Sequence, residues 1–323
     1  MPQADVPLSL LVLAAGQEGL VSAMQCDAEG FGKYRRHRLV AAGRAVLVTR
    51  GVLDLTPVLA ARGTLVGGRP DEHRRRAAFL ALLAHGPAAV AVGECALALL
   101  GVQGLPREIR PEVWLPPGTP RVARAGIVVR CYDGPIPTTG YAGFRVAAPE
   151  WALAQAVLRL SRDDAVAVLD SAVQRGLVGR SAVARVEKLT RGRPGARRVR
   201  ECWGLVDGRS QSPLETRARL QCVDAGVPPD ELQVPIRDAG GRIIARGDLG
   251  WRLRNGRWLV IEIDGAGPHS DPAALFADRR RQNAIIATRL VDPLRFTARD
   301  IARRTLIPAA VAAHLATDAL DAT

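Results

Sequence analysis

The sequence predicts an α/β protein built from several domains. Its 323 residues are about twice the length of an ordinary domain. Apolar residues make up 48% of the chain and charged residues 24%, which is the balance of a folded protein rather than a disordered one. Three stretches with different patterns follow one another. We therefore expect three domains, over residues 1–62, 71–207 and 208–316.

Cysteine spacing and apolar runs limit the class of protein further. The five cysteines lie far apart and form no CxxC pair, which argues against a disulfide framework and against a structural zinc site. The apolar segments Leu8–Ala15 and Ala88–Val102 are too short to span a bilayer. We expect a cytoplasmic protein without a membrane partner, and the sequence leaves its oligomeric state open.

The net charge of the chain is +13, which favours polyanionic partners and nucleic acid first. All but two of the 45 basic residues are arginines, since Lys33 and Lys188 are the only lysines. Together with the abundance of Ala, Gly and Val, this composition is typical of a GC-rich coding bias. Where the charge lies along the chain is therefore more informative than its total.

The first 62 residues predict three short helices followed by a β-hairpin. Helices are expected over Leu8–Ala15, over Gly19–Gln25 and over the basic segment Phe31–Val40, which Gly43 closes. The segment Arg44–Leu55 alternates around a glycine turn, as a hairpin does. Helix, turn, basic helix and hairpin in this order indicate a winged helix-turn-helix domain.

In such a domain the basic helix would enter the major groove of double-stranded DNA, and the hairpin tip would lie along a phosphate backbone. Arginine and lysine bind phosphates and guanine edges, and an aromatic side chain can pack beside them. The candidate DNA-binding residues are Lys33, Tyr34, Arg35, Arg36, Arg38, Arg44 and Arg50. The alternative is a solvated basic face on a small helical subdomain.

The middle region, residues 71–207, predicts an α+β fold and carries no chemical motif. The expected helices are Arg74–Ala84, Glu94–Leu100, Pro149–Leu160, Asp163–Arg175 and Ser181–Leu189. The expected strands are Glu112–Leu115 and Ile127–Tyr132. A basic stretch from Arg191 to Arg200 follows. It either contacts DNA or forms a solvated face.

The last third of the chain predicts the element order α-β-β-β-α-β-α. Ser212 caps the first helix, which has proline at its first position and runs to about Asp224. An Asn-Gly pair predicts a hairpin turn between the second and third strands. The later elements are expected over Leu232–Arg237, Ile243–Leu253, Trp258–Asp264, Pro272–Ala287 and Arg289–Phe296, with a last helix capped by Thr297.

The third of these strands carries two carboxylates on one face. Because a strand has a period of two residues, Glu262 and Asp264 lie on the same side. Adjacent carboxylates repel each other unless a cation or hydrogen-bond donors compensate. Asp248, across the hairpin, falls within reach of them, and Glu215 could close the cluster. Converging oxygens suit Mg²⁺ or Mn²⁺, so Asp248, Glu262 and Asp264 are candidate metal ligands.

Nearby arginines offer a different interpretation of the same acids, in which each carboxylate pairs with a guanidinium. The arginines available for such pairs are Arg246, Arg252, Arg254, Arg279, Arg280 and Arg281.

Several motifs of the last third also occur together in a known family. They are Ser212-Pro-Leu-Glu215, Arg246-Gly-Asp248, Val260-Ile-Glu262-Ile-Asp264, His269, Asp278-Arg-Arg and Arg295-Phe-Thr297. Through them the chain resembles actinobacterial proteins that join an AbiEi-antitoxin-like winged helix to a C-terminal endonuclease domain. That domain is like the very-short-patch-repair enzymes and has the PD-(D/E)XK nuclease fold. The resemblance is strongest over about residues 208–305 and moderate over residues 1–60.

The resemblance implies roles for individual residues. Asp248 and Glu262 would bind the metal, and Glu215 would be the helix acid. The nuclease fold usually has a lysine two residues after the second acid, whereas this chain has Asp264 there. Patch-repair enzymes use a histidine near the metal, which implies His269 as the general acid or base.

Two functions are expected from these patterns. The first is a Mg²⁺-dependent DNA endonuclease docked by the winged helix. Its candidate catalytic residues are Glu215, Asp248, Glu262, Asp264 and His269. The second is a non-enzymatic regulator of the AbiEi antitoxin type that keeps an inactive nuclease fold. Its partner would be a toxin or another defence-system protein.

Overall fold

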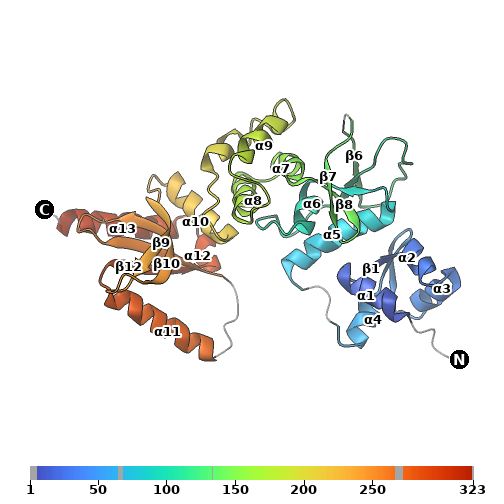
Figure 1. Cartoon of the computed structure of the whole chain (residues 1–323), viewed down its shortest axis with the longest axis horizontal. Helices are drawn as coiled ribbons and strands as arrows, with labels where there is room; N and C mark the ends of the chain where they lie inside the picture. The colour runs from blue at the N-terminus through green and yellow to red at the C-terminus, as the bar shows by residue number, and fades with distance from the viewer. Residues whose placement is uncertain (1–5, 65–67, 133, 266–271, 322–323) are drawn as a thin grey trace. The chain divides into compact units, whose positions relative to one another are not determined.

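The computed structural model describes residues 6–64, 68–132, 134–265 and 272–321 (Figure 1). The described chain mixes helices with three sheets, which confirms the predicted α/β class. It divides into two compact units. The first unit comprises Met1–Ser161 and Leu177–Arg200, and the second comprises Arg162–Gly176 and Glu201–Thr323.

The N-terminal part of the first unit packs short helices against a three-stranded sheet with strand order β1-β3-β2. Its elements are α1 (Leu8–Gly16), β1 (Leu20–Ser22), α2 (Ala23–Ala28), α3 (Lys33–Ala41), β2 (Val46–Thr49), β3 (Val52–Asp54) and α4 (Thr56–Ala61). Buried Leu10, Val21, Phe31 and Leu53 belong to its core. The basic helix and the hairpin form as predicted.

The expected helix over Gly19–Gln25 is wrong in its first half. Leu20–Ser22 pairs antiparallel with Val52–Asp54, and a helix begins only at Ala23. Ser22 accepts a hydrogen bond from the Gln25 backbone, and the Gln25 side chain accepts one from the Ser22 backbone. This capping box explains where the strand ends and the helix begins.

The rest of the first unit surrounds a five-stranded sheet with strand order β6-β5-β4-β8-β7. Its strands are β4 (Val90–Ala91), β5 (Glu112–Trp114), β6 (Val128–Arg130), β7 (Thr138–Tyr141) and β8 (Phe144–Ala147). Its helices are α5 (Pro70–His85), α6 (Gly93–Leu99), α7 (Pro149–Val157) and α9 (Ala182–Thr190). The hairpin of β7 and β8 was not expected. Its strands Thr138–Tyr141 and Phe144–Ala147 pair antiparallel.

The second unit contains a four-stranded sheet with strand order β12-β11-β10-β9, in which only the β11–β12 pair is parallel. Its strands are β9 (Glu231–Arg237), β10 (Ile243–Arg252), β11 (Trp258–Asp264) and β12 (Val291–Thr297). Its helices are α8 (Arg162–Gln174), α10 (Pro213–Asp224), α11 (Pro272–Ala287), α12 (Ala298–Ala302) and α13 (Leu306–Asp321), with a 3-10 helix at Arg200–Leu205. The element order α-β-β-β-α-β-α agrees with the expected one.

Helix α8 belongs to the second unit, although the sequence suggested the middle region for it. The carboxylate of Asp170 on α8 is buried against α10, where it accepts hydrogen bonds from Thr216 and Arg219 over 2.9 Å each. The additional helix α13 packs against α10. Neither contact leaves a signal in local sequence, since each joins segments far apart in the chain.

Both faces of the second unit's sheet are covered by helices (Figure 1). On one face Leu259 and Ile261 of β11 share a core with residues of α10 and α13. On the other face Val260 packs with Ile285 of α11. Glu262 and Asp264 follow Val260 at the period of two and so lie on the α11 side. Among the described helices, none is long and apolar enough to cross a membrane.

Candidate functional site

Two of the predicted acids, Glu215 and Asp248, are joined by a third side chain. The amide nitrogen of Gln233 donates to Glu215 Oε2 over 3.0 Å and lies 3.3 Å from Asp248 Oδ1. Glu215 also accepts from the Gln211 backbone N–H over 2.8 Å, and Asp248 Oδ2 accepts from the Ile263 backbone over 2.7 Å. Helix α10, strand β9 and strand β10 thus bring their polar groups to one place.

Gln233 was not singled out from the sequence. It lies within β9 with a φ of +57°, a left-handed conformation that costs a non-glycine residue about 1 kcal/mol or more. It falls between the cross-strand pairs Val234–Gly247 and Leu232–Leu249, so the register sets it opposite Asp248. The one available signal was a polar residue in the strand next to the acids.

Arginines contact the other two predicted acids. Strand β12 pairs in parallel with β11 and sets Arg295 opposite Glu262. Arg295 donates to both oxygens of Asp264 over 2.8 and 3.1 Å, and its Nε lies 3.6 Å from Glu262 Oε2. Arg281 of α11 lies 3.3 Å from the same Glu262 oxygen. Pairing with arginine therefore holds for Asp264 and in part for Glu262, although Arg295 was not among the six arginines that the sequence suggested.

The expected set of three metal ligands does not form. Across the part of the chain that the structure describes, no three His, Cys, Asp or Glu side chains are grouped so as to hold a metal ion. The physical reason is that Asp264 turns its carboxylate to Arg295 in the neighbouring strand. His269, the predicted general acid or base, lies outside the described residues.

Asp248 and Glu262 remain as a pair. Asp248 accepts from the backbone of Ile263, the residue that follows Glu262. Glu262 is buried, and its Oε1 atom has no hydrogen-bond partner within the described structure. A buried acceptor without a donor is costly, so this oxygen is suited to a cation. Mg²⁺ is commonly held by one or two carboxylates together with substrate phosphates and water, which these two residues fit.

Burial makes the acids of this site hard to ionise. The pKa of Glu215 is raised to about 7, first by burial and then by the nearby charge of Asp248. Burial also raises the pKa of Asp248, and Asp264 adds to the effect. The pKa of Glu262 is raised by burial, although Arg281 and Arg295 oppose the shift. Buried acids that lie close together are common at functional sites. A bound cation there offsets both their mutual repulsion and the cost of burying their charges.

The basic helix α3 contains one arginine that does not face solvent. Arg36 is buried, pairs with Asp27 of α2, and donates to the carbonyl oxygens of Ala23 and Phe31 over 3.3 and 2.9 Å. Its guanidinium therefore joins α2 to α3. These bonds all use Nη1 and argue against a role for Arg36 in DNA binding, and that role stays a prediction.

The remaining cations of α3 are exposed. Lys33, Arg35 and Arg38 all face solvent. The guanidinium of Arg38 lies over the ring of Tyr34, whose side chain is exposed, and that of Arg35 lies over Phe31. No acidic residue occurs within α3, so its outer face carries no negative charge. Arg50 at the hairpin tip is exposed too, whereas Arg44 is half-buried.

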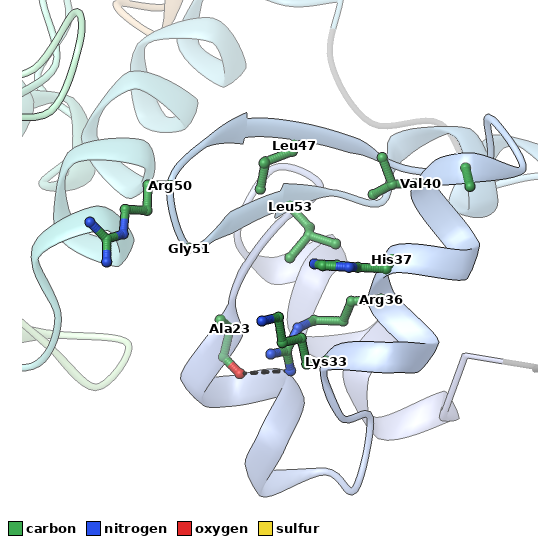
Figure 2. Close-up of a pocket in the computed structure, with 10 residues that line it drawn as sticks. Ala23, Lys33, Arg36, His37, Val40, Leu47, Arg50, Gly51 and Leu53 are labelled. Atoms are coloured by element: carbon green, nitrogen blue, oxygen red, sulfur yellow. Dashed lines mark hydrogen bonds between the residues drawn. The ribbon is translucent and has the colours of Figure 1, made fainter.

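A groove of about 790 Å³ separates α3 from the β2–β3 hairpin. Figure 2 shows Lys33 and His37 projecting from α3 on the side of this groove, with Leu47 and Leu53 on the hairpin side. The same view shows Arg36 bonded to the carbonyl of Ala23. A basic helix beside a hairpin with a groove between them is suited to an extended polyanion.

Comparison with known proteins adds relatives without stated functions. No family model matches the chain. Over 134 residues it is 34% identical to the proteins MT2308 and Rv2248 of Mycobacterium tuberculosis, both described as uncharacterized. The match covers 42% of this chain and 48% of each relative, so the similarity spans about half of the relatives' length. The resemblance to AbiEi-like and patch-repair-like proteins stays a prediction.

Proposed function

We propose that this protein binds double-stranded DNA through a winged helix formed by α1 to β3. The proposal is supported by the element order α-β-α-α-β-β and by the strand order β1-β3-β2. In this type of domain the second helix of the helix-turn-helix enters the major groove, and here that helix is α3. Its exposed Lys33, Arg35 and Arg38 would reach phosphates or base edges.

Duplex affinity tests this part of the proposal. We expect Lys33→Ala plus Arg38→Ala to weaken binding of a labelled duplex by ~10-fold or more, since each phosphate contact contributes to the affinity. Arg175→Ala plus Arg180→Ala, which removes two exposed arginines far along the chain, is the charge-matched control. Equal affinity of the double variant and the control would refute docking through α3.

We further propose that Asp248 and Glu262 form a two-carboxylate Mg²⁺ or Mn²⁺ site for cleavage of the phosphodiester backbone. The single observation that carries this is the buried Glu262 Oε1 beside Asp248, which has no hydrogen-bond partner among the described residues. The order α10-β9-β10-β11-α11-β12 and the strand order of the sheet support a nuclease fold of the PD-(D/E)XK type. When bound, such a metal lowers the pKa of water and stabilises charge on the scissile phosphate.

The chain's own residues would orient the site. Gln233 and the Ile263 backbone hold the Asp248 carboxylate from two sides. Arg281 and Arg295 lie beside Glu262 and would turn to the phosphate when DNA enters, because a phosphate binds guanidinium groups well. Nicking of supercoiled plasmid in Mg²⁺ or Mn²⁺ tests the proposal, with Asp248→Ala plus Glu262→Ala as the inactive control.

A non-enzymatic DNA-binding regulator is the second candidate function, and the arginine contacts favour it. Arg295 and Arg281 already compensate Asp264 and Glu262. In this case the second unit would be a scaffold or would bind a toxin or another defence-system protein. The regulator predicts duplex binding that EDTA leaves unchanged and an absence of nicking by the wild-type chain.

A further inference from the structure

A cavity of about 570 Å³ lies in the first unit, away from α3. It is bordered by the end of β6, by α7 and by the segment after α9. Its polar and aromatic lining includes Arg130, Tyr132, Trp151, Gln155, Arg159 and Arg193. Its volume is in the range of small-molecule sites, which combine aromatic walls with a few placed polar groups.

Gln155 supplies an unused donor at this cavity. Its side chain is buried, with 2% of the residue exposed. Its Oε1 accepts from the Gly93 backbone N–H over 2.9 Å, which fixes the orientation of the amide. Its Nε2 has no acceptor within the described structure. Because this nitrogen is shielded in the free protein, an acceptor reaches it from the cavity side only when a neighbouring side chain of the wall shifts.

Among the described residues that line the cavity, the charged ones are all arginines. Arg130 and Arg159 are held in place by Glu112, over 2.7 and 2.6 Å, and Glu112 is buried, with 2% of the residue exposed. Arg193 has no carboxylate partner among the described residues. None of the residues that line the described cavity is acidic. Guanidinium groups with an amide donor suit an oxyanion, and phosphate above all.

The cavity also has aromatic walls. The guanidinium of Arg193 lies 5.5 Å from the centre of the Trp151 ring, so a cation and a flat ring already meet there. Tyr132 contributes a second ring, and its burial raises the pKa of its hydroxyl to about 12, so it stays a neutral donor. A planar heterocycle can stack on these rings as bases do on protein aromatics.

We propose that this cavity binds a phosphorylated nucleoside, with the phosphate at Arg193 and Gln155 and the base on Trp151. The site lies outside the DNA-docking helix and outside the acid pair, so it adds a small-molecule effector to the proposed function. The same chemistry occurs in a free nucleotide and at the 5′-phosphorylated end of a strand. Both sources are therefore compared in the test.

Calorimetric titration of the full chain with adenosine monophosphate and with uridine monophosphate tests the site. We expect saturable binding that Arg193→Ala and Trp151→Leu each weaken by ~10-fold or more. Arg197→Ala, an exposed arginine of the same basic segment, should bind as the wild type does. Adenosine and inorganic phosphate should each bind more weakly than the nucleotide. A short 5′-phosphorylated oligonucleotide that binds more tightly than the free nucleotide would identify a strand end as the source.

Three results would overturn the proposal. They are no saturable binding of either nucleotide to the wild type, equal binding of inorganic phosphate alone, and equal loss of affinity in Arg197→Ala. Circular dichroism of Arg193→Ala separates a lost contact from a lost fold. A folded Arg193→Ala variant with wild-type affinity would also rule the site out.

Discussion

The side-chain amide of Gln233 donates to the carboxylate of Glu215 over 3.0 Å, from a strand position where Gln233 adopts a left-handed backbone. This hydrogen bond lowers the pKa of Glu215, while burial and Asp248 raise it more strongly. The net result is an acid that holds its proton near neutral pH in the folded chain. Its protonation couples the stability of the second unit to pH.

Replacement of Glu215 by glutamine is expected to stabilise the protein at alkaline pH. The folded pKa of about 7 lies above the ordinary glutamate pKa of 4.5, so the folded state binds the proton more tightly than the unfolded state. Stability is then fully present below the unfolded pKa and is lost as pH rises through about 7. We expect Glu215→Gln to gain roughly 1–3 kcal/mol over the wild type at alkaline pH.

Urea denaturation at pH values on both sides of this range measures the effect. The difference between the variant and the wild type should shrink below the unfolded pKa of glutamate. Glu201→Gln, which changes an exposed acid of the same unit, is the control and should show no such dependence. A Glu215→Gln difference that is constant with pH would contradict the burial argument.

Arg36 and Arg38 are neighbours on α3 with opposite expected roles. Arg36→Ala should destabilise the first unit by about 2 kcal/mol, because the buried carbonyls of Ala23 and Phe31 lose their donor. Arg38→Ala should leave stability within about 0.5 kcal/mol and weaken DNA binding instead. Chemical denaturation and duplex anisotropy on the two variants separate these effects. A stable Arg36→Ala variant with impaired binding would reverse the assignment.

Helices and strands that a short-range sequence pattern determines were predicted correctly. The Asn-Gly turn, the capping serine at Ser212 and the alternation of β11 gave the element order of the second unit. The strand Leu20–Ser22 was missed because its three residues are defined by pairing with Val52–Asp54, a contact that local sequence does not encode. The β7–β8 hairpin and the place of α8 were missed for the same reason.

The site was predicted in part. Period-two geometry placed Glu262 and Asp264 on the same face of β11, and the hairpin brought Asp248 next to them. The sequence could not show that β12 pairs in parallel with β11. Through this pairing Arg295 forms an ion pair with Asp264, whose carboxylate is then no longer free to bind a metal with the other acids. Nor could it show that Arg36 turns inward, since its spacing on the helix resembles that of its exposed neighbours.

The salt dependence of duplex binding should report on the number of phosphates that the exposed cations neutralise. Loss of Lys33, Arg38 or Arg50 is expected to reduce the slope of log affinity against log salt by about 0.9 for each phosphate contact removed. Measuring wild type and single alanine variants over a range of NaCl concentrations gives these slopes. An unchanged slope in all three variants would place the DNA elsewhere on the protein.

Gly247 is expected to be intolerant of any side chain. A Cβ at this position would lie 1.7 Å from Val260 Cγ1, in the strand that carries Glu262. Gly247→Ala must therefore push β10 from β11 and move Asp248, at a cost of about 1–3 kcal/mol. Gly204→Ala, where no heavy atom lies within 4 Å of the added carbon, is the matched control. Thermal unfolding that is equal for the two variants would contradict the close approach of these strands.

Nicking of supercoiled plasmid by the full chain shows whether Asp248 and Glu262 form a metal-dependent cleavage site. We expect activity with Mg²⁺ or Mn²⁺ that EDTA abolishes, and a loss of ~100-fold or more in Asp248→Asn and in Glu262→Gln. Asp264→Asn, whose acid pairs with Arg295, should keep most of the activity. No nicking by the wild type, or nicking that the Asp248 and Glu262 variants retain in full, would contradict the account.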